Sequence, residues 1–236
     1  MRRLVIATRN RHKFRELKAL LAVPGIRWHS LAEFPGAPRV DEGARTFDAN
    51  AMRKAHAAAR ATGLWAVADD SGLEVDGLRK APGVRSARFA GRHGNDRANN
   101  AKVLRLLAGR PAPARRAQYR CSLALSDGSR VVALARGSWR GRIAGHPRGR
   151  GGFGYDPIFM VPTLGKTVAE LPIAAKQRLS HRAVAARRMR AALSKLITRP
   201  HTKCGAASAA ESFGVGVSAP DPAGSGGSRP GWGPAA

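Results

Sequence analysis

Acidic residues are scarce in this chain. Asp and Glu together number 15 among 236 residues, against 42 Lys and Arg, so the formal charge is +27. A field of this sign attracts polyanions, and it would equally serve a small phosphorylated ligand. The basic residues are spread along the chain instead of forming one block. This spread favours a compositional origin of the charge, and we expect no stable nucleic acid partner.

Cysteine and long apolar runs are also in short supply. Cys121 and Cys204 lie far apart in the sequence, which excludes a disulfide framework or a cluster of cysteine metal ligands. The apolar runs are a handful of residues long, far below the ~20 that span a bilayer. The apolar stretch within the N-terminal MRRLVIATRN is too short for a secretory signal. We therefore expect a cytoplasmic protein with no membrane partner.

What the chain does contain is an alternation of strand and helix signals, in a composition that is 43% apolar. Strands are predicted over 3–7, 26–31, 65–69, 71–78 and 158–162, a hairpin over 116–139, and helices over 14–22, 46–62, 95–109 and 181–197. This order predicts an α/β fold with a mixed sheet flanked by helices. From Thr198 onward the composition shifts to Gly, Ala, Ser and Pro. We predict one domain over 1–197 and a low-complexity, disordered tail over 198–236.

Polar residues follow the first predicted strand. In ATRNRHKFRE, Thr8, Asn10 and Lys13 lie between the strand and the next helix. Free amides and the positive end of a helix dipole bind phosphate, and a lysine adds a positive charge. The glycines of a Walker A loop are missing, which excludes that motif. An ordinary polar loop would contain the same residue types, so the stretch alone leaves both interpretations open.

The predicted helix that begins after Thr46 and ends at Gly63 carries a second polar pair. Asn50 and Lys54 are four residues apart, so they share one stripe of the helix. Such a stripe can offer an amide and an ammonium group to a ligand. Taken by itself, the pair is more typical of a solvated surface.

Two adjacent acids end the apolar run in AVADDSGLEV. Consecutive strand residues point to opposite faces, so Asp69 and Asp70 reach one ligand only if the strand breaks, and we expect Ser71–Gly72 to supply that break. Neighbouring carboxylates repel each other, and a divalent cation relieves the repulsion. Mg²⁺ is bound by one or two carboxylates together with substrate phosphates, and Glu42 is a candidate third ligand. The alternative is a turn or cap without a metal.

The stretch GFGYDP places an aromatic ring on a flexible backbone, where a purine base could stack. Asp156 can accept hydrogen bonds from the edge of a base, and His181 and Arg182 can donate to a carbonyl group. In the alternative interpretation, Phe153 and Tyr155 are core aromatics and the His-Arg pair is a helix start.

The order of these motifs resembles that of the Ham1-like nucleoside triphosphate pyrophosphatases, also called inosine triphosphatases or dITP/XTP pyrophosphatases. The resemblance covers about residues 3–197, and it is carried by IATRNRHKFREL, TFDANAMRKA, ADDSGLEV, APGVRSARFAG, GGFGYDPIF, GKTVAEL and SHRAVA. It implies hydrolysis of ITP, dITP and XTP to the monophosphate and pyrophosphate with Mg²⁺. It also implies two lobes with a deep nucleotide-binding cleft, and a homodimer.

The resemblance further implies roles for individual residues. Thr8, Arg9, Asn10, Arg11, His12, Lys13 and Lys54 would hold the triphosphate, and Ser71 would touch the substrate. Glu42 and Asp70 would hold the metal, and Asp70 would also take the proton of the attacking water. The base pocket would consist of Phe153, Gly154, Tyr155, Asp156, Lys176, His181 and Arg182.

Two positions depart from the pattern of the family. Ala49 stands where relatives commonly have Glu, which would thin the carboxylate shell of a metal, and Ala174–Ala175 precede Lys176 where acids are frequent. Two other functions compete with this one. A basic nucleic-acid-binding protein without catalysis would explain the charge but not the retained acids, and a pyrophosphatase for pyrimidine or modified triphosphates would share the phosphate residues.

Overall fold

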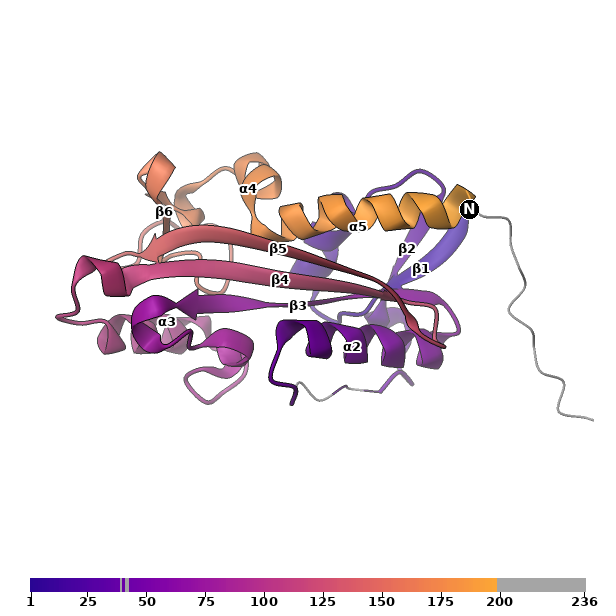
Figure 1. Cartoon of the computed structure of the whole chain (residues 1–236), viewed down its shortest axis with the longest axis horizontal. Helices are drawn as coiled ribbons and strands as arrows, with labels where there is room; N and C mark the ends of the chain where they lie inside the picture. The colour runs from indigo at the N-terminus through magenta and orange to yellow at the C-terminus, as the bar shows by residue number, and fades with distance from the viewer. Residues whose placement is uncertain (39, 41–42, 199–236) are drawn as a thin grey trace, which may run out of the picture. The chain divides into compact units, whose positions relative to one another are not determined.

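A mixed β-sheet is the scaffold of the chain (Figure 1). In this computed structural model the described residues are 1–38, 40 and 43–198. Among them, seven strands pair in the order β2-β1-β3-β4-β5-β6-β7. The bounds are β1 Arg2–Ile6, β2 Ile26–Ser30, β3 Trp65–Val75, β4 Arg116–Ser126, β5 Val131–Ile143, β6 Phe159–Val161 and β7 Lys166–Thr167. Contacts group Met1–Pro200 into one compact unit.

The sheet combines parallel and antiparallel strands, as the sequence predicts. β1 pairs parallel with β2 and β3, because a helix returns the chain between them, whereas the pairs from β3 to β7 are antiparallel. The helices are α1 Arg11–Leu20, α2 Phe47–Thr62, α3 Asp96–Leu106, α4 Ile173–Leu179 and α5 His181–Thr198. None of the helices in the described part is long and apolar enough to cross a membrane.

Helices cover both faces of the central strands (Figure 1). On one face, Ala51 and Ala55 of α2 pack against Ala68 of β3 and Ala124 of β4, and these small side chains let the helix lie close to the sheet. The other face carries α1 and α5, whose apolar residues pack with β3 and β4 in a separate core cluster. A third cluster joins α3 to the far ends of β3, β4 and β5 and to β6.

The predicted break at Ser71–Gly72 is wrong. β3 runs without interruption from Trp65 to Val75, and its ladder with β4 extends from Ala66 opposite Ser126 to Val75 opposite Ala117. The two strands predicted over 65–69 and 71–78 are therefore one. Gly72 serves a close approach instead of a break, since a Cβ at this position would collide with the Ser86 hydroxyl and the Gly83 carbonyl.

Several other boundaries differ from the predictions. The first helix begins at Arg11, three residues before the predicted start, and the hairpin continues beyond 139 to Ile143. The α4 helix, Ile173–Leu179, was not predicted, because its seven residues have little apolar periodicity. The caps of α2 are confirmed: the Thr46 side chain accepts a hydrogen bond from the Ala49 amide, and Gly63 ends the helix with φ +65°.

Candidate active site

A hollow of about 970 Å³ is the larger of the two described cavities. Its walls come from the β1–α1 turn, α2, β3, the segment 84–96, the loop 153–156 and the start of α5. Of the residues that the sequence singles out, it is lined by Thr8, Arg9, Asn10, His12, Lys13, Lys54, Asp70, Ser71, Phe153, Gly154, Tyr155, Asp156, His181 and Arg182. Segments up to 174 residues apart in the sequence are thus brought together.

Two of the predicted residues do not line this hollow, and a third lies outside the described residues. Arg11 is exposed on α1 and does not line this hollow. Lys176 also lies outside the lining, but it contacts two residues that do line it. Glu42 lies outside the described residues, so the structure gives no account of its predicted metal role.

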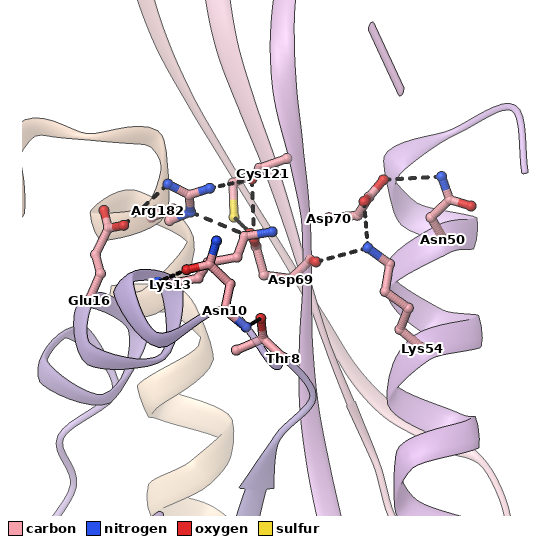
Figure 2. A network of polar contacts seen from close by, with 11 residues as sticks. Thr8, Asn10, Lys13, Glu16, Asn50, Lys54, Asp69, Asp70, Cys121 and Arg182 are labelled. Carbon is pink, nitrogen blue, oxygen red and sulfur yellow. Dashed lines mark hydrogen bonds and ion pairs between the residues drawn. The ribbon is translucent and has the colours of Figure 1, made fainter. Parts of the chain in front are cut away.

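Asp69 and Asp70 point to opposite faces of β3, because the strand is unbroken (Figure 2). Asp69 faces α1 and α5, and Asp70 faces α2. The expectation that both carboxylates reach one cation is therefore wrong. The strand separates two charged clusters that share its backbone, and both acids line the same hollow.

Asp69 forms ion pairs with two positively charged side chains. Asp69 is 5% exposed, its Oδ2 lies 2.6 Å from Lys13 Nζ and 3.6 Å from Arg182 Nε, and its Oδ1 accepts from the Cys121 thiol at 3.1 Å. Burial raises the pKa of this carboxyl, but Lys13 and Arg182 outweigh burial and hold its pKa far below the usual range. Asp69 is therefore a fixed anion and not a general base.

Arg182 is buried at the start of α5, and two of its nitrogens donate hydrogen bonds. Nη1 donates to Glu16 at 3.2 Å, and Nη2 donates to the Ser71 hydroxyl at 2.7 Å. Burial lowers the pKa of this guanidinium, but Glu16 and Asp69 outweigh burial and raise it. Arg182 thus links α1, β3 and α5, and its predicted donation to a base stays a prediction.

The Asp70 cluster belongs to α2. Lys54 Nζ donates to Asp70 Oδ1 at 2.7 Å and to the Asp69 carbonyl at 3.3 Å, and Asn50 Nδ2 donates to Asp70 Oδ2 at 3.1 Å (Figure 2). The i, i+4 spacing of Asn50 and Lys54 lets both side chains reach one carboxylate. This pair is therefore part of the site and not a solvated surface.

The donor set around Asp70 fits a magnesium ion that is completed by a ligand. In the residues that the structure describes, no three His, Cys, Asp or Glu side chains gather as a closed metal centre. Mg²⁺ typically takes one or two protein carboxylates and receives its other ligands from phosphate oxygens and water. The Asp70 carboxylate, on the wall of a hollow that also contains Lys13 and Lys54, is consistent with that arrangement.

The β1–α1 turn has the features of a phosphate site. Asn10 caps α1, and its side chain accepts from the Lys13 amide at 3.1 Å; Thr8 accepts from the Asn10 amide at 3.2 Å. The next two amides, of Arg11 and His12, have no acceptor within the helix, because they lie in its first turn. Arg9 is tied to the Ala37 carbonyl at 2.5 Å, which fixes the loop.

On the opposite wall, Asp156 organises the aromatic loop. Its carboxylate is 3% exposed and accepts from the Phe153 amide at 2.9 Å, Lys176 Nζ at 2.6 Å and the Tyr119 hydroxyl at 3.1 Å. A Cβ at Gly152, where φ is +76°, would collide with this carboxylate, so the position requires glycine. Asp156 therefore holds the loop that carries the Phe153 ring.

His181 lines the hollow together with Tyr119. It is 4% exposed, its ring stacks on Tyr119 at 4.7 Å between centroids, and its Nδ1 has no hydrogen-bond partner in the described part of the chain. Burial and the neighbouring Arg182 hold the pKa of His181 well below its ordinary value, so the ring is neutral. The α5 helix can approach this closely because Gly137 of β5 has no side chain to meet the His181 carbonyl.

Helix α3 supplies a clamp on Gly154. Asp96 Oδ2 accepts from the Gly154 amide at 2.7 Å, and Asn100 Nδ2 donates to the Gly154 carbonyl at 3.0 Å. Asn99 holds the adjoining segment through the Ala90 amide at 2.7 Å. The sequence reasoning missed these residues, and their only signal was that three polar side chains in the first turns of α3 are poor helix formers.

A model of the Ham1 family matches residues 4–192. The chain belongs to the Ham1 family. Two relatives are the dITP/XTP pyrophosphatases of Desulforamulus reducens, 48% identical over 82% of this chain and 96% of the relative, and of Geobacter sulfurreducens, 50% identical over 77% and 92%. Among solved structures, the HAM1 protein of Coxiella burnetii is 39% identical with a TM-score of 0.76 and covers 83% of this chain and 100% of that chain.

A further solved structure, the nucleoside-triphosphatase or dITP/XTP pyrophosphatase of Mycobacterium abscessus, is 40% identical with a TM-score of 0.66. The match covers 84% of this chain and 100% of that chain. The agreement confirms the predicted mixed α/β fold. The seven stretches that carried the resemblance, from IATRNRHKFREL to SHRAVA, all lie within the matched residues.

Proposed function

We propose that this Ham1-family chain hydrolyses dITP, XTP and ITP to the monophosphate and pyrophosphate. One observation carries the proposal: a single hollow is lined by two aspartates of β3 with their lysine partners from α1 and α2, by an aromatic loop, and by a neutral, buried histidine. The lysines suit a polyphosphate, and the opposite wall suits a flat base. The names of the relatives support dITP and XTP as substrates.

In the proposed reaction, water attacks the α-phosphorus, the bond from that phosphorus to the bridging oxygen breaks, and pyrophosphate leaves. Asp70 orients the water and accepts its proton at a carboxylate oxygen, while Lys54 and Asn50 hold that carboxylate in position. Lys13 and Lys54 stabilise the charge that develops on the phosphate oxygens. Asp70 and Glu42 would hold Mg²⁺, which supplies further charge neutralisation and makes water more acidic.

Selectivity for the base follows from the buried polar atoms. His181 presents a ring nitrogen without a partner among the described residues, and a base that satisfies it gains a buried hydrogen bond. In the tautomer that carries its proton on Nδ1, the ring donates to a keto group at position 6, whereas the amine of adenine offers a second donor. A mismatch of this kind can lower kcat/KM by several powers of ten.

Other features of the proposal come from the family resemblance. We propose that residues 1–197 form the catalytic domain and that the enzyme is a cytoplasmic homodimer.

Pyrophosphate release from ITP, XTP, dITP, ATP, GTP and dTTP, each with Mg²⁺, tests the function. We expect release from the three keto-purine substrates at rates at least about 100-fold above those with ATP and dTTP. Release confined to dTTP would favour a pyrimidine enzyme. Absence of release with every triphosphate would contradict the proposed function.

The Gly154 clamp gives a further prediction. In Asp96→Ala, the Gly154 amide loses a charge-assisted hydrogen bond, which contributes about 1.5–3 kcal/mol, so the Phe153 loop loosens. We expect KM for dITP to rise about tenfold, with kcat changed less than about threefold, in steady-state assays. Asp96→Asn retains an acceptor oxygen and should restore most of the affinity.

Asn95→Ala is the matched control for the clamp. It removes the α3 cap to the Ala98 amide, which weakens the helix by about 1 kcal/mol, but it leaves Gly154 untouched. Equal increases in KM for Asn95→Ala and Asp96→Ala would show that α3 acts through its stability alone.

A further inference from the structure

One face of the hairpin formed by β4 and β5 is basic. Among the described residues, no helix covers the part of this face that extends from the first turn of α2 towards Arg116 and Arg142. The strand register places the side chains of paired residues on the same face: Arg116 is opposite Arg142, Gln118 opposite Arg140, Arg120 opposite Ser138, and Ser122 opposite Arg136. All five arginines are exposed, and we call them the arginine face. Ser122 marks its border, because its hydroxyl donates to Asp48 in the first turn of α2.

Acids neutralise only part of the arginine face. Arg136 pairs with Asp48 at 2.7 Å, and Arg120 lies 3.7 Å from Glu74. The other three arginines, Arg116, Arg140 and Arg142, have no carboxylate within ion-pair distance among the described residues. Three positive charges on two adjacent strands thus remain for an external anion.

The three unpaired arginines surround a second hollow, of about 570 Å³. Trp139 and Pro162 line it beside them. Arg116 and Arg142 stand directly opposite each other, and like charges in such pairs destabilise a sheet. An anion that lies between the two guanidinium groups removes this repulsion.

We propose that the arginine face binds the phosphate backbone of single-stranded nucleic acid. The face is elongated: Arg136 and Arg142 are six residues apart on β5, which is roughly 20 Å, and the β4 row runs about 4.8 Å beside it. Such a double row suits a chain of phosphates better than one compact anion. Trp139 also lines the hollow, but its ring packs against Phe159 on the other face of β5, so the contact that we propose is with the phosphate backbone alone.

A second copy of the chain is a poorer occupant, because an isologous contact through this face would set arginine rows against each other. The proposal does not depend on the catalytic hollow. The arginine face lies on the α2 side of β4 and β5, whereas the base side of the catalytic hollow, with Tyr119 and His181, lies on the α5 side.

Fluorescence anisotropy with a labelled oligothymidylate of about 20 nucleotides tests the proposal on the full chain. The probe carries no purine base for the catalytic hollow. We expect R116Q/R140Q/R142Q to bind at least about tenfold more weakly at about 50 mM salt, and the slope of log K against log salt to become shallower by about 2, the value for three lost phosphate contacts. Pyrophosphate release should be unchanged, which separates this test from that of the proposed function.

The matched control removes three exposed arginines elsewhere, as R53Q/R60Q/R105Q on α2 and α3. It should weaken binding less than about threefold. Equal weakening by the two triple variants would show a diffuse effect of net charge and overturn the proposal. Tighter binding of inorganic polyphosphate than of DNA, or loss of a dimer by R116Q/R140Q/R142Q in sedimentation, would also overturn it.

Discussion

Replacing Asp70 by Asn is expected to lower kcat for dITP by about 10³-fold, within the range of about 10²–10⁴ that proton transfer contributes in enzymes. Asn has the same shape and still offers an oxygen to Lys54, but it cannot accept a proton from water, and it is a weaker ligand for a divalent cation. The measurement is pyrophosphate release at saturating substrate, with circular dichroism as the check on folding.

Asp76→Asn is the matched control, because Asp76 also pairs with a lysine but on the exposed surface, 2.6 Å from Lys80. Its kcat should equal that of the wild type. Near-normal turnover of Asp70→Asn, with an intact spectrum, would remove Asp70 from the reaction and leave the two lysines as binding groups only.

Replacing Asp69 by Asn is expected to destabilise the fold by about 3–5 kcal/mol, because it leaves Lys13 and Arg182 beside a neutral partner in a buried cluster. Glu16 still pairs with Arg182 in the variant, which favours the lower part of this range. Chemical denaturation at pH 7 gives the free energy of unfolding. Asp76→Asn again serves as the control, and its surface pair should contribute no more than about 1 kcal/mol.

The pH dependence of the Asp69 effect has a definite sign. The folded-state pKa of Asp69 is depressed, so in acid the unfolded chain binds the proton more readily than the folded chain. The stability from Asp69 is therefore complete above the pKa of an unfolded Asp, about 3.9, and is lost as the pH falls from there towards the folded-state pKa. The difference between wild type and Asp69→Asn should shrink below about pH 4. A difference that stays constant from pH 7 to pH 3 would show that the ionic contacts do not contribute.

The sequence predicted the parts of the site that depend on local spacing. Asn50 and Lys54 share a helix stripe because of the 3.6-residue period, and Thr8, Asn10 and Lys13 follow a strand because the hydrophobic run ends there. These features need no knowledge of distant segments. The structure confirms the positions of these residues on their helix and turn, which follow from the local backbone alone.

The parts that failed depend on partners far away in the chain. Ser71–Gly72 has the composition of a turn, but β4 offers hydrogen bonds along its full length, and this ladder keeps β3 extended. Asp96 lies 58 residues from the Gly154 amide that it accepts from. A spread of arginines in the sequence likewise becomes one face only when the register of β4 and β5 is known.

Because Asp69 and Asp70 lie on opposite faces of β3, the enzyme does not tolerate a shift in the register of this strand. If β3 slipped by one residue against β4, both acids would turn to the opposite faces of the strand, and only one of them would take the former position of the other. At least one charge pair would be lost, and the neighbouring apolar residues of β3 would turn towards the wrong helices. The alternation of apolar side chains that fills the core is thus also the device that assigns each carboxylate its task.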